Sequence, residues 1–189
     1  MYGSRLRAYS NCWLACEMDI LYRLGQLWHN MTAQPLSQPE LKEITNNLTH
    51  QELSLFRQMS QSDQQHAYRV FRLLRDSGQV DVDLLAAALL HDVGKVRGDL
   101  SAWDRSIVVL GETFAPQRAK QWGNGDESGW ERAFVVREQH AAWGAALAKN
   151  VGSRPGVVDL IKRHQDPLPV DDRRKDERLM LLRWADDQN

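Results

Sequence analysis

The sequence predicts an all-α protein, and three observations lead to that fold class. Apolar residues recur at spacings of three and four along most of the 189 residues, as they do on the buried face of a helix. The alternation of apolar and polar residues that marks a half-buried strand is scarce. Capping residues, glycines and prolines separate the apolar stretches, where helices begin and end. With 42% hydrophobic residues, the chain can bury one sizeable core, so we expect one domain with an appendage.

The first expected helix covers residues 12–31 and has a broad apolar face. That face suits packing against the rest of the domain, dimerisation, or contact with a membrane surface. A Gln- and Pro-rich stretch then breaks the chain, and a short helix is expected at 41–48. Thr49 followed by Glu52 resembles a capping box, which indicates the start of another helix.

Polar caps and glycines bound the next two expected helices. The first begins at a serine, either 60 or 62, and ends at Gly78. The second begins near an aspartate, either 81 or 83, and ends at Gly94. Both segments carry enough apolar residues to contribute to the core.

The second half of the chain begins less regularly. A helix around 103–114 and a turn led by Pro116 precede the loop 122–129, which either covers a site or merely connects two helices. Three further helices are expected at 130–149, 155–164 and 172–187.

Charge and composition exclude several classes of protein. The net charge is −1 and the isoelectric point about 6.6, so there is no global signal for nucleic-acid binding. Cys12 and Cys16 lie one helical turn apart and offer only half of a zinc site. No stretch approaches the roughly 20 apolar residues of a transmembrane span, and no signal-peptide cleavage site follows an apolar block. We therefore expect a cytoplasmic protein.

Six polar residues fall on the apolar stripes of five expected helices. His66, for example, shares a face with Val70 and Leu74. Burying four imidazoles and two carboxylates in one small core is costly unless they have partners. A divalent cation removes that cost, because it binds neutral imidazole and ionised carboxylate directly. The candidate ligands are His66, His91, Asp92, His140, His164 and Asp186, whereas His29 and His50 are expected at the surface.

The order of these residues resembles a known family. His66, then the pair His91-Asp92, then the distal Asp186 is similar to the H…HD…D signature of the HD-domain superfamily of metal-dependent phosphohydrolases. The string His-Asp-Val-Gly-Lys at 91–95, with two later histidines, resembles the HDIG subgroup, whose members commonly carry two metals. The resemblance implies an HD-domain helical bundle at 60–189, with an additional N-terminal helical segment at 1–59.

The resemblance also implies a role for each residue. A first metal would be bound by His66, His91, Asp92 and Asp186, and Asp92 would bridge to a second metal held also by His140 and His164. One or two divalent ions per chain are expected, with Mn, Fe, Mg, Ni and Zn all possible. Lys95 matches the lysine that approaches the scissile phosphate in this family, so Asp92 and Lys95 are the expected catalytic residues. The alternative for Lys95 is a cation that stabilises a helix C-terminus.

Two features depart from the family pattern. Many two-metal relatives have a His-His pair in the late helix, where this chain has Arg163-His164. Only one imidazole is therefore available there, which makes the second metal less firmly implied than the first. The stretch 165–169 lacks the Gly-Tyr-Pro element of the cyclic di-GMP phosphodiesterase branch, and that substrate is not assigned.

The expected function is hydrolysis, by metal-activated water, of a phosphomonoester or phosphodiester in a nucleotide or a related phosphorylated metabolite. Two alternatives remain open, an HD-fold di-iron oxygenase and a non-catalytic regulatory or binding domain that retains the metal. A homodimer through the helix at 12–31 is a further possibility. Four charged residues near the expected ligands either bind the rest of the substrate or lie solvated at the surface: Arg97, Arg137, Lys162 and Arg163.

Overall fold

The computed structural model describes residues 34–98, 100, 102–126, 129–166 and 176–189. Within these ranges the chain forms helices and no strand, so the predicted all-α class is confirmed for them. The elements in chain order are α2 (Gln38–Asn47), α3 (His50–Phe56), α4 (Gln61–Asp76), α5 (Val82–Leu90), the 3₁₀ helix η1 (Val93–Arg97), α6 (Ala102–Phe114), α7 (Pro116–Trp122), α8 (Arg132–Asn150), α9 (Pro155–Arg163) and α10 (Glu177–Asp187).

Side-chain caps begin the early helices. The hydroxyl of Thr49 accepts a hydrogen bond from the Glu52 N–H at 3.2 Å, and the Glu52 carboxylate accepts one from the Thr49 N–H at 2.9 Å. This is the predicted capping box at the start of α3. Of the two serines considered for α4, Ser60 is the cap. Asp81, the first of the two aspartates considered, caps α5 through two backbone N–H groups.

Helix α5 ends four residues earlier than predicted, at Leu90 rather than Gly94. Asp92 has φ −93° and ψ 2°, outside the α-helical region, and the chain continues as η1. The apolar pattern does not reveal this end, because Val93 is as buried as the preceding leucines. His91 and Asp92 therefore occupy the junction of two helices.

Two further boundaries differ from the prediction. Pro116 begins the helix α7 rather than a turn, since proline suits the first helical position. The last helix begins at Glu177, after the N-cap Asp176. The earlier part of its predicted range, 172–175, lies outside the described residues.

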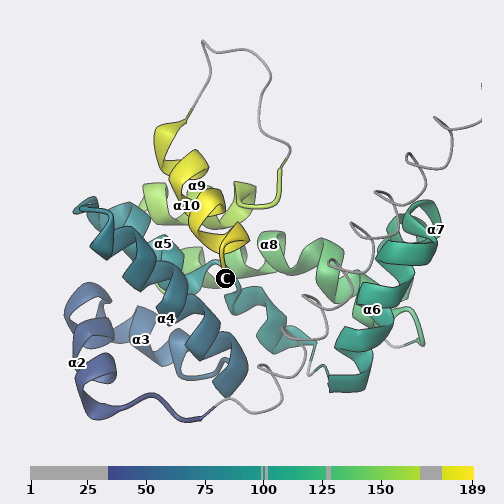
Figure 1. Ribbon diagram of the computed structural model, residues 1–189, viewed down its shortest axis with the longest axis horizontal. Helices are drawn as coiled ribbons and strands as arrows, with labels where there is room; N and C mark the ends of the chain where they lie inside the picture. Colours follow the sequence, from purple (N-terminus) through teal and green to yellow (C-terminus); the bar gives the residue numbers. More distant parts are fainter. Residues whose placement is uncertain (1–33, 99, 101, 127–128, 167–175) are drawn as a thin grey trace, which may run out of the picture.

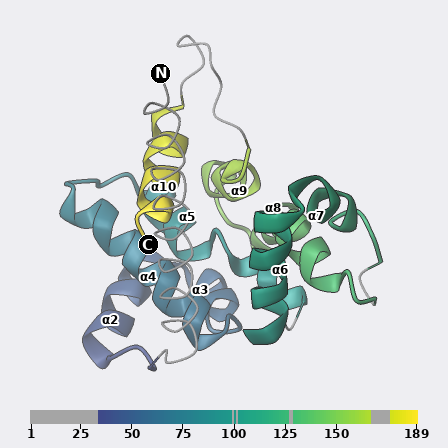
Figure 2. The ribbon, with the colours of Figure 1, turned by 45° about the vertical axis from the view of Figure 1, so that its right-hand side comes forward.

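The buried apolar side chains form two clusters. The larger joins α2, α3, α4, α5, α9, α10 and the second half of α8, which contributes Ala145 and Ala148. The smaller joins α6, α7 and the start of α8, which contributes Ala133 and Phe134. Helix α8 runs from one cluster to the other, with α6 and α7 at one end of the molecule and α2 to α5 at the other (Figures 1 and 2). His140 therefore lies on α8 between the two clusters.

The predicted boundary between 1–59 and 60–189 stays a prediction. Side chains of α2 and α3 belong to the larger cluster, among them Ile44, Leu53 and Phe56. The predicted helix at 12–31, and with it Cys12 and Cys16, lies outside the described residues. In the part of the chain that the structure describes, no helix is long and apolar enough to cross a membrane.

Candidate metal centre

The six predicted ligands converge from five places in the fold. Helix α4 carries His66 and α10 carries Asp186, while the junction after α5 carries His91 and Asp92. Helix α8 carries His140, and His164 is the C-cap residue of α9. The rings of His66 and His91, of His91 and His164, and of His140 and His164 each have centroids 5.2 Å apart. A continuous row of imidazoles therefore lines the centre.

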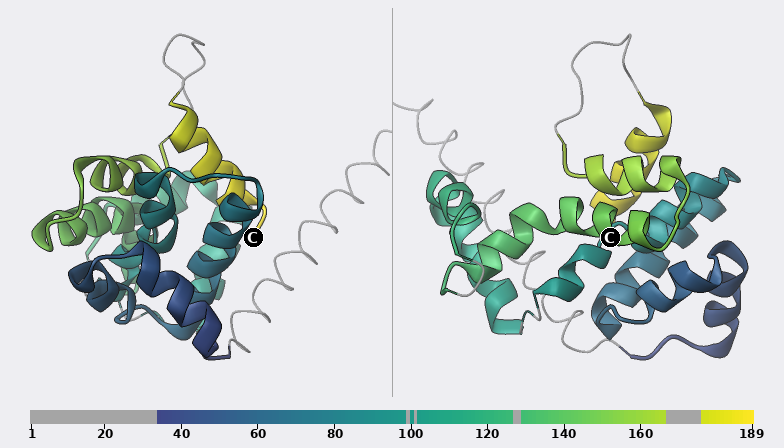
Figure 3. Two further views of the ribbon diagram at one scale, coloured as in Figure 1. Left: turned by 90° about the vertical axis from the view of Figure 1, so that its left-hand side faces the viewer. Right: turned by 180° about the vertical axis from the view of Figure 1, so that it is seen from behind.

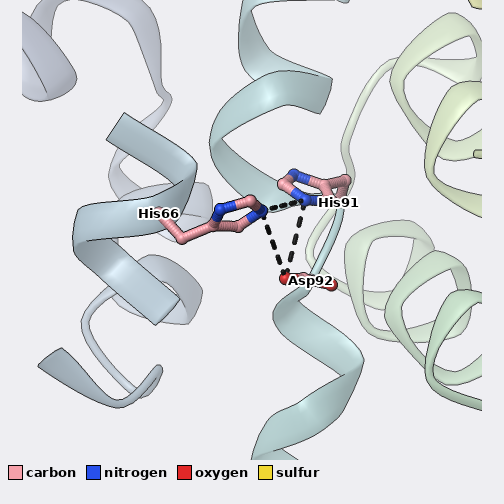
Figure 4. A group of neighbouring side chains, drawn as sticks. All are labelled: His66, His91 and Asp92. Atoms are coloured by element: carbon pink, nitrogen blue, oxygen red, sulfur yellow. Dashed lines mark hydrogen bonds and ion pairs between the residues drawn. The ribbon is translucent and has the colours of Figure 1, made fainter. Parts of the chain in front are cut away.

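One end of the row is the group drawn in Figure 4. Nε2 of His66 lies 3.3 Å from Nε2 of His91 and 3.8 Å from Oδ2 of Asp92, and Nε2 of His91 lies 3.5 Å from that oxygen. Oδ1 of Asp186 lies 2.9 Å from Nε2 of His66 and 3.5 Å from Nε2 of His91. The next residue, Asp187, is exposed.

Asp92 faces both ends of the row. Its Oδ2 points toward His66 and His91, whereas its Oδ1 lies 3.2 Å from Nε2 of His140. Lys95 donates a 2.6 Å hydrogen bond to Oδ2. One carboxylate thus contacts histidines from three helical elements and a lysine one turn farther along its own chain.

Three of the four histidines are oriented by the backbone. Nδ1 of His91 lies 3.0 Å from the Ala88 carbonyl, Nδ1 of His140 lies 2.9 Å from the Arg137 carbonyl, and Nδ1 of His164 lies 2.7 Å from the Ile161 carbonyl. A carbonyl oxygen only accepts, so each Nδ1 must carry the hydrogen. In the neutral ring the lone pair is then on Nε2, the atom that faces the centre.

These groups fit a divalent metal at two places. The ligand atoms of His66, His91 and Asp92 lie within 4.8 Å of one another, and so do those of Asp92, His140 and His164. Nε2 of His140 is fully buried and has no hydrogen-bond partner among the described residues, although Oδ1 of Asp92 lies 3.2 Å away. A buried nitrogen without a partner is costly. A cation between His140, His164 and Asp92 would supply the missing interaction.

Burial and charge shift the pKa values in opposite directions along the row. Burial lowers the pKa of His91, but the charges of Asp92 and Asp186 outweigh that effect and raise it to about 9. Burial and the neighbouring positive His91 lower the pKa of His164 to about 3. The pKa of Asp92 is well below its usual value, because Lys95 and His91 outweigh the effect of burial. The centre therefore combines ionised carboxylates with a neutral His164.

The close contact of η1 with α8 places Asp92 and Lys95. A Cβ added at Gly94 would overlap the carbonyl oxygen of His140 and approach the Gly144 nitrogen to 2.7 Å. Glycine at 94 is therefore required by this backbone contact rather than by freedom at a helix end. Sequence reasoning missed Gly144, whose own added Cβ would lie 3.1 Å from the Gly94 nitrogen. The two glycines are 50 positions apart in sequence, and no local pattern links them.

Most of the other charged candidates have protein partners. Arg97 stacks over the ring of Trp143 at 5.2 Å from its centroid, and Arg137 pairs with Glu112 at 3.2 Å. Arg163 binds two carboxylates, whereas Lys162 is exposed. Lys95, by contrast, contacts the predicted ligand Asp92 directly. His50 is exposed, as predicted, and His29 lies outside the described residues.

The comparison with protein families agrees with this geometry. The model of the HD domain matches residues 64–187, well over half of the chain. The protein therefore belongs to the HD domain family, whose members commonly are metal-dependent phosphohydrolases. Searches of curated proteins and of solved structures gave no match. The matched range includes all six predicted ligands and Lys95.

Proposed function

We propose that the protein is a phosphohydrolase that uses two divalent metal ions to cleave a phosphomonoester or phosphodiester of a nucleotide or a related phosphorylated metabolite. The observation that carries the proposal is the shared position of Asp92, whose two oxygens belong to two neighbouring groups of potential ligands. Carboxylate-bridged pairs of metal sites are suited to in-line displacement at phosphorus.

In this proposal, His66, His91, Asp92 and Asp186 hold the first ion, and Asp92, His140 and His164 hold the second. The string from His91 to Lys95 supports assignment to the HDIG subgroup. Bound ions would supply Lewis acidity toward a phosphate oxygen and activate water for attack. The donor set of imidazole nitrogen and carboxylate oxygen suits Mn, Fe, Ni or Zn, and Mg through its carboxylates.

The side chains have separate tasks around the reacting phosphate. The backbone carbonyls at Ala88, Arg137 and Ile161 keep three imidazoles in the orientation that directs Nε2 inward. Lys95, whose side chain is partly exposed, holds Asp92 through its ammonium group. An entering phosphate oxygen competes for that ammonium group, so Lys95 binds and orients the substrate as a point charge.

Hydrolysis by the metal-loaded protein tests the proposal. Protein stripped by chelator and reloaded with Mn²⁺ or Mg²⁺ is incubated with a panel of nucleoside monophosphates, cyclic nucleotides and sugar phosphates, and released phosphate or nucleoside is measured. We expect turnover that Asp92→Asn abolishes and that Asp187→Asn, an exposed neighbour of the site, leaves unchanged. Equal turnover by the wild type and Asp92→Asn contradicts the proposal.

The same experiment separates the alternatives. Turnover that requires oxygen and bound iron would replace hydrolysis with the oxygenase function. Thermal stabilisation by a panel compound, with no product from any of them, would indicate a binding or regulatory domain. The dimer predicted through 12–31 involves residues outside those described, so it remains a hypothesis.

A further inference from the structure

Two arginines connect α9 and the residues just after it to α10. His164 caps the end of α9 and α10 carries Asp186, so the two helices each bring one candidate ligand to the metal centre. They lie next to each other in the fold (Figures 1 and 3). The position of His164 relative to Asp186 therefore depends on what holds α9 against α10.

The first connection runs from α9 to the beginning of α10. Arg163 donates to Asp159 at 2.7 Å and to Oδ2 of Asp176 at 3.1 Å. The other oxygen of Asp176 accepts from the Leu179 N–H at 3.4 Å and so caps α10. The Arg163 side chain is 33% exposed and that of Asp176 is 22% exposed. This ion pair is thus only partly exposed to water. Its geometry is fixed by the three hydrogen bonds just described.

The second connection runs in the opposite direction. Arg183 on α10, three residues before Asp186, donates to the backbone carbonyl of Asp166. Asp166 follows His164 by two residues. Arg163 therefore holds the N-terminal end of α10, and Arg183 ties the chain just after His164 to the C-terminal part of α10.

The two candidate metal sites depend on these connections to different degrees. The first site has four protein donors in the proposed assignment, and none of them is on α9. Its donor on α10, Asp186, is also held by direct contacts with His66 and His91. The second site has three, and His164 is one of them. At a three-donor site, a displaced imidazole removes a third of the protein ligands. Loss of the tie should therefore weaken the second site and spare the first.

We propose that Arg163 is a positioning residue for the second metal site, which holds His164 in place by tying the end of α9 to the N-cap of α10. This inference rests on the proposed function, since it assumes that both sites take a metal. Arg163 contacts neither metal nor substrate in this account.

Metal titration tests the proposal without reference to activity. Chelator-stripped wild type and Arg163→Ala are titrated with Mn²⁺ by calorimetry, and bound manganese is counted by elemental mass spectrometry. We expect two equivalents in the wild type. In Arg163→Ala the affinity of the first should be unchanged, and that of the second should fall by about 10-fold or more, as is typical when a partner that orients a ligand is lost.

Three variants serve as controls. Arg154→Ala removes an ion pair to Asp83 at the opposite end of α9, so it should leave both affinities unchanged. Arg163→Lys can reach one carboxylate but not both in the forked geometry of arginine, and it should give an intermediate second affinity. Asp176→Asn keeps an N-cap side chain but removes the charge, and it should resemble Arg163→Ala. Far-UV circular dichroism confirms that each variant is helical.

The possible outcomes separate this inference from the proposed function. A wild type that takes up no metal overturns both. A wild type with one equivalent overturns the second site and this inference with it. Two equivalents bound with wild-type affinities by Arg163→Ala overturn this inference alone. An Arg154→Ala protein with the same loss of second-site affinity would show a general loosening of α9 and would also overturn the inference.

Discussion

The two halves of the candidate metal centre share Asp92 but differ in charge and exposure. The half with His66, His91 and Asp186 contains a second carboxylate, and its outer members are partly exposed, His66 at 19% and Asp186 at 31%. The half with His140 and His164 is buried, and among the described residues Asp92 is its one carboxylate. Without a metal, the first half is stabilised by histidine–carboxylate pairs, whereas in the second Nε2 of His140 has no hydrogen bond to any described residue.

Some of the buried polar groups of the centre therefore have partners before a cofactor binds, and others do not. A proton on His91 can take the place of a cation in the first half, because two carboxylates stabilise it. In the second half the pKa of His164 is too low for a proton to do the same. We therefore infer that metal binding in the first half displaces a proton, while metal binding in the second half supplies an interaction that was missing.

Replacement of the shared residue should have the largest effect. Asp92→Asn keeps the size of the side chain but removes the charge that both halves use, so we expect loss of both metals and of turnover. Metal content by elemental mass spectrometry, measured with the hydrolysis assay, checks this. Retention of one full equivalent would show that one half does not depend on Asp92 and would break the proposed link between them.

The contact between η1 and α8 fixes the position of Asp92, which both halves of the centre share. Gly94→Ala should disturb this contact. The added methyl group overlaps the backbone of α8, and overpacking of this kind typically costs about 1–3 kcal/mol. We expect a lower free energy of unfolding in urea and weaker binding of both metals. Gly129→Ala is the matched control, since the nearest atom to its added Cβ is 3.8 Å away. Equal stability of the two variants would contradict the close packing described for η1.

The next prediction concerns the first half alone. In metal-free protein the pKa of His91 is about 9 against 6.5 in the unfolded chain, so the folded state binds more protons between these values. Stability should therefore be greatest below pH 6.5 and fall as the pH rises to 9, by at most about 1.4 kcal/mol per pH unit. Urea unfolding across this range measures the slope. His91→Gln should flatten it, and an unchanged slope in that variant would assign it to another group.

The smallest effect is expected at Lys95. Lys95→Met removes the ammonium group but keeps the length of the side chain, so both metals should stay bound. The substrate should bind more weakly, with KM raised by about 10-fold, the effect of losing roughly one charge-assisted hydrogen bond. Steady-state kinetics and metal content are measured together. Loss of metal in this variant would instead make Lys95 part of the structure of the centre.

Much of the fold and the set of candidate ligands could be predicted from the sequence, because both depend on local patterns. Helical spacing places His66 beside Val70 on α4, and capping residues mark the starts of α3 and α4. Pro116 is a further local signal, because proline suits the first position of a helix as well as a turn. Those inferences need only residues within one or two turns of each other.

The features that could not be predicted depend on contacts between distant segments. Helix α5 ends at Leu90, although buried apolar sequence resumes at Val93, and the reason that glycine stands at 94 lies on α8. The pair of Arg163 with Asp176 joins residues 13 positions apart, across a segment outside the described residues. No periodicity within a single helix contains that information.

In the proposed centre one carboxylate joins two metal sites of unequal character. The metal content per chain tests this arrangement in protein purified without added metal or chelator, compared with His91→Gln and His164→Gln. We expect about two equivalents in the wild type, with His164→Gln retaining one. A wild type that holds no metal and takes up none on reconstitution would contradict it.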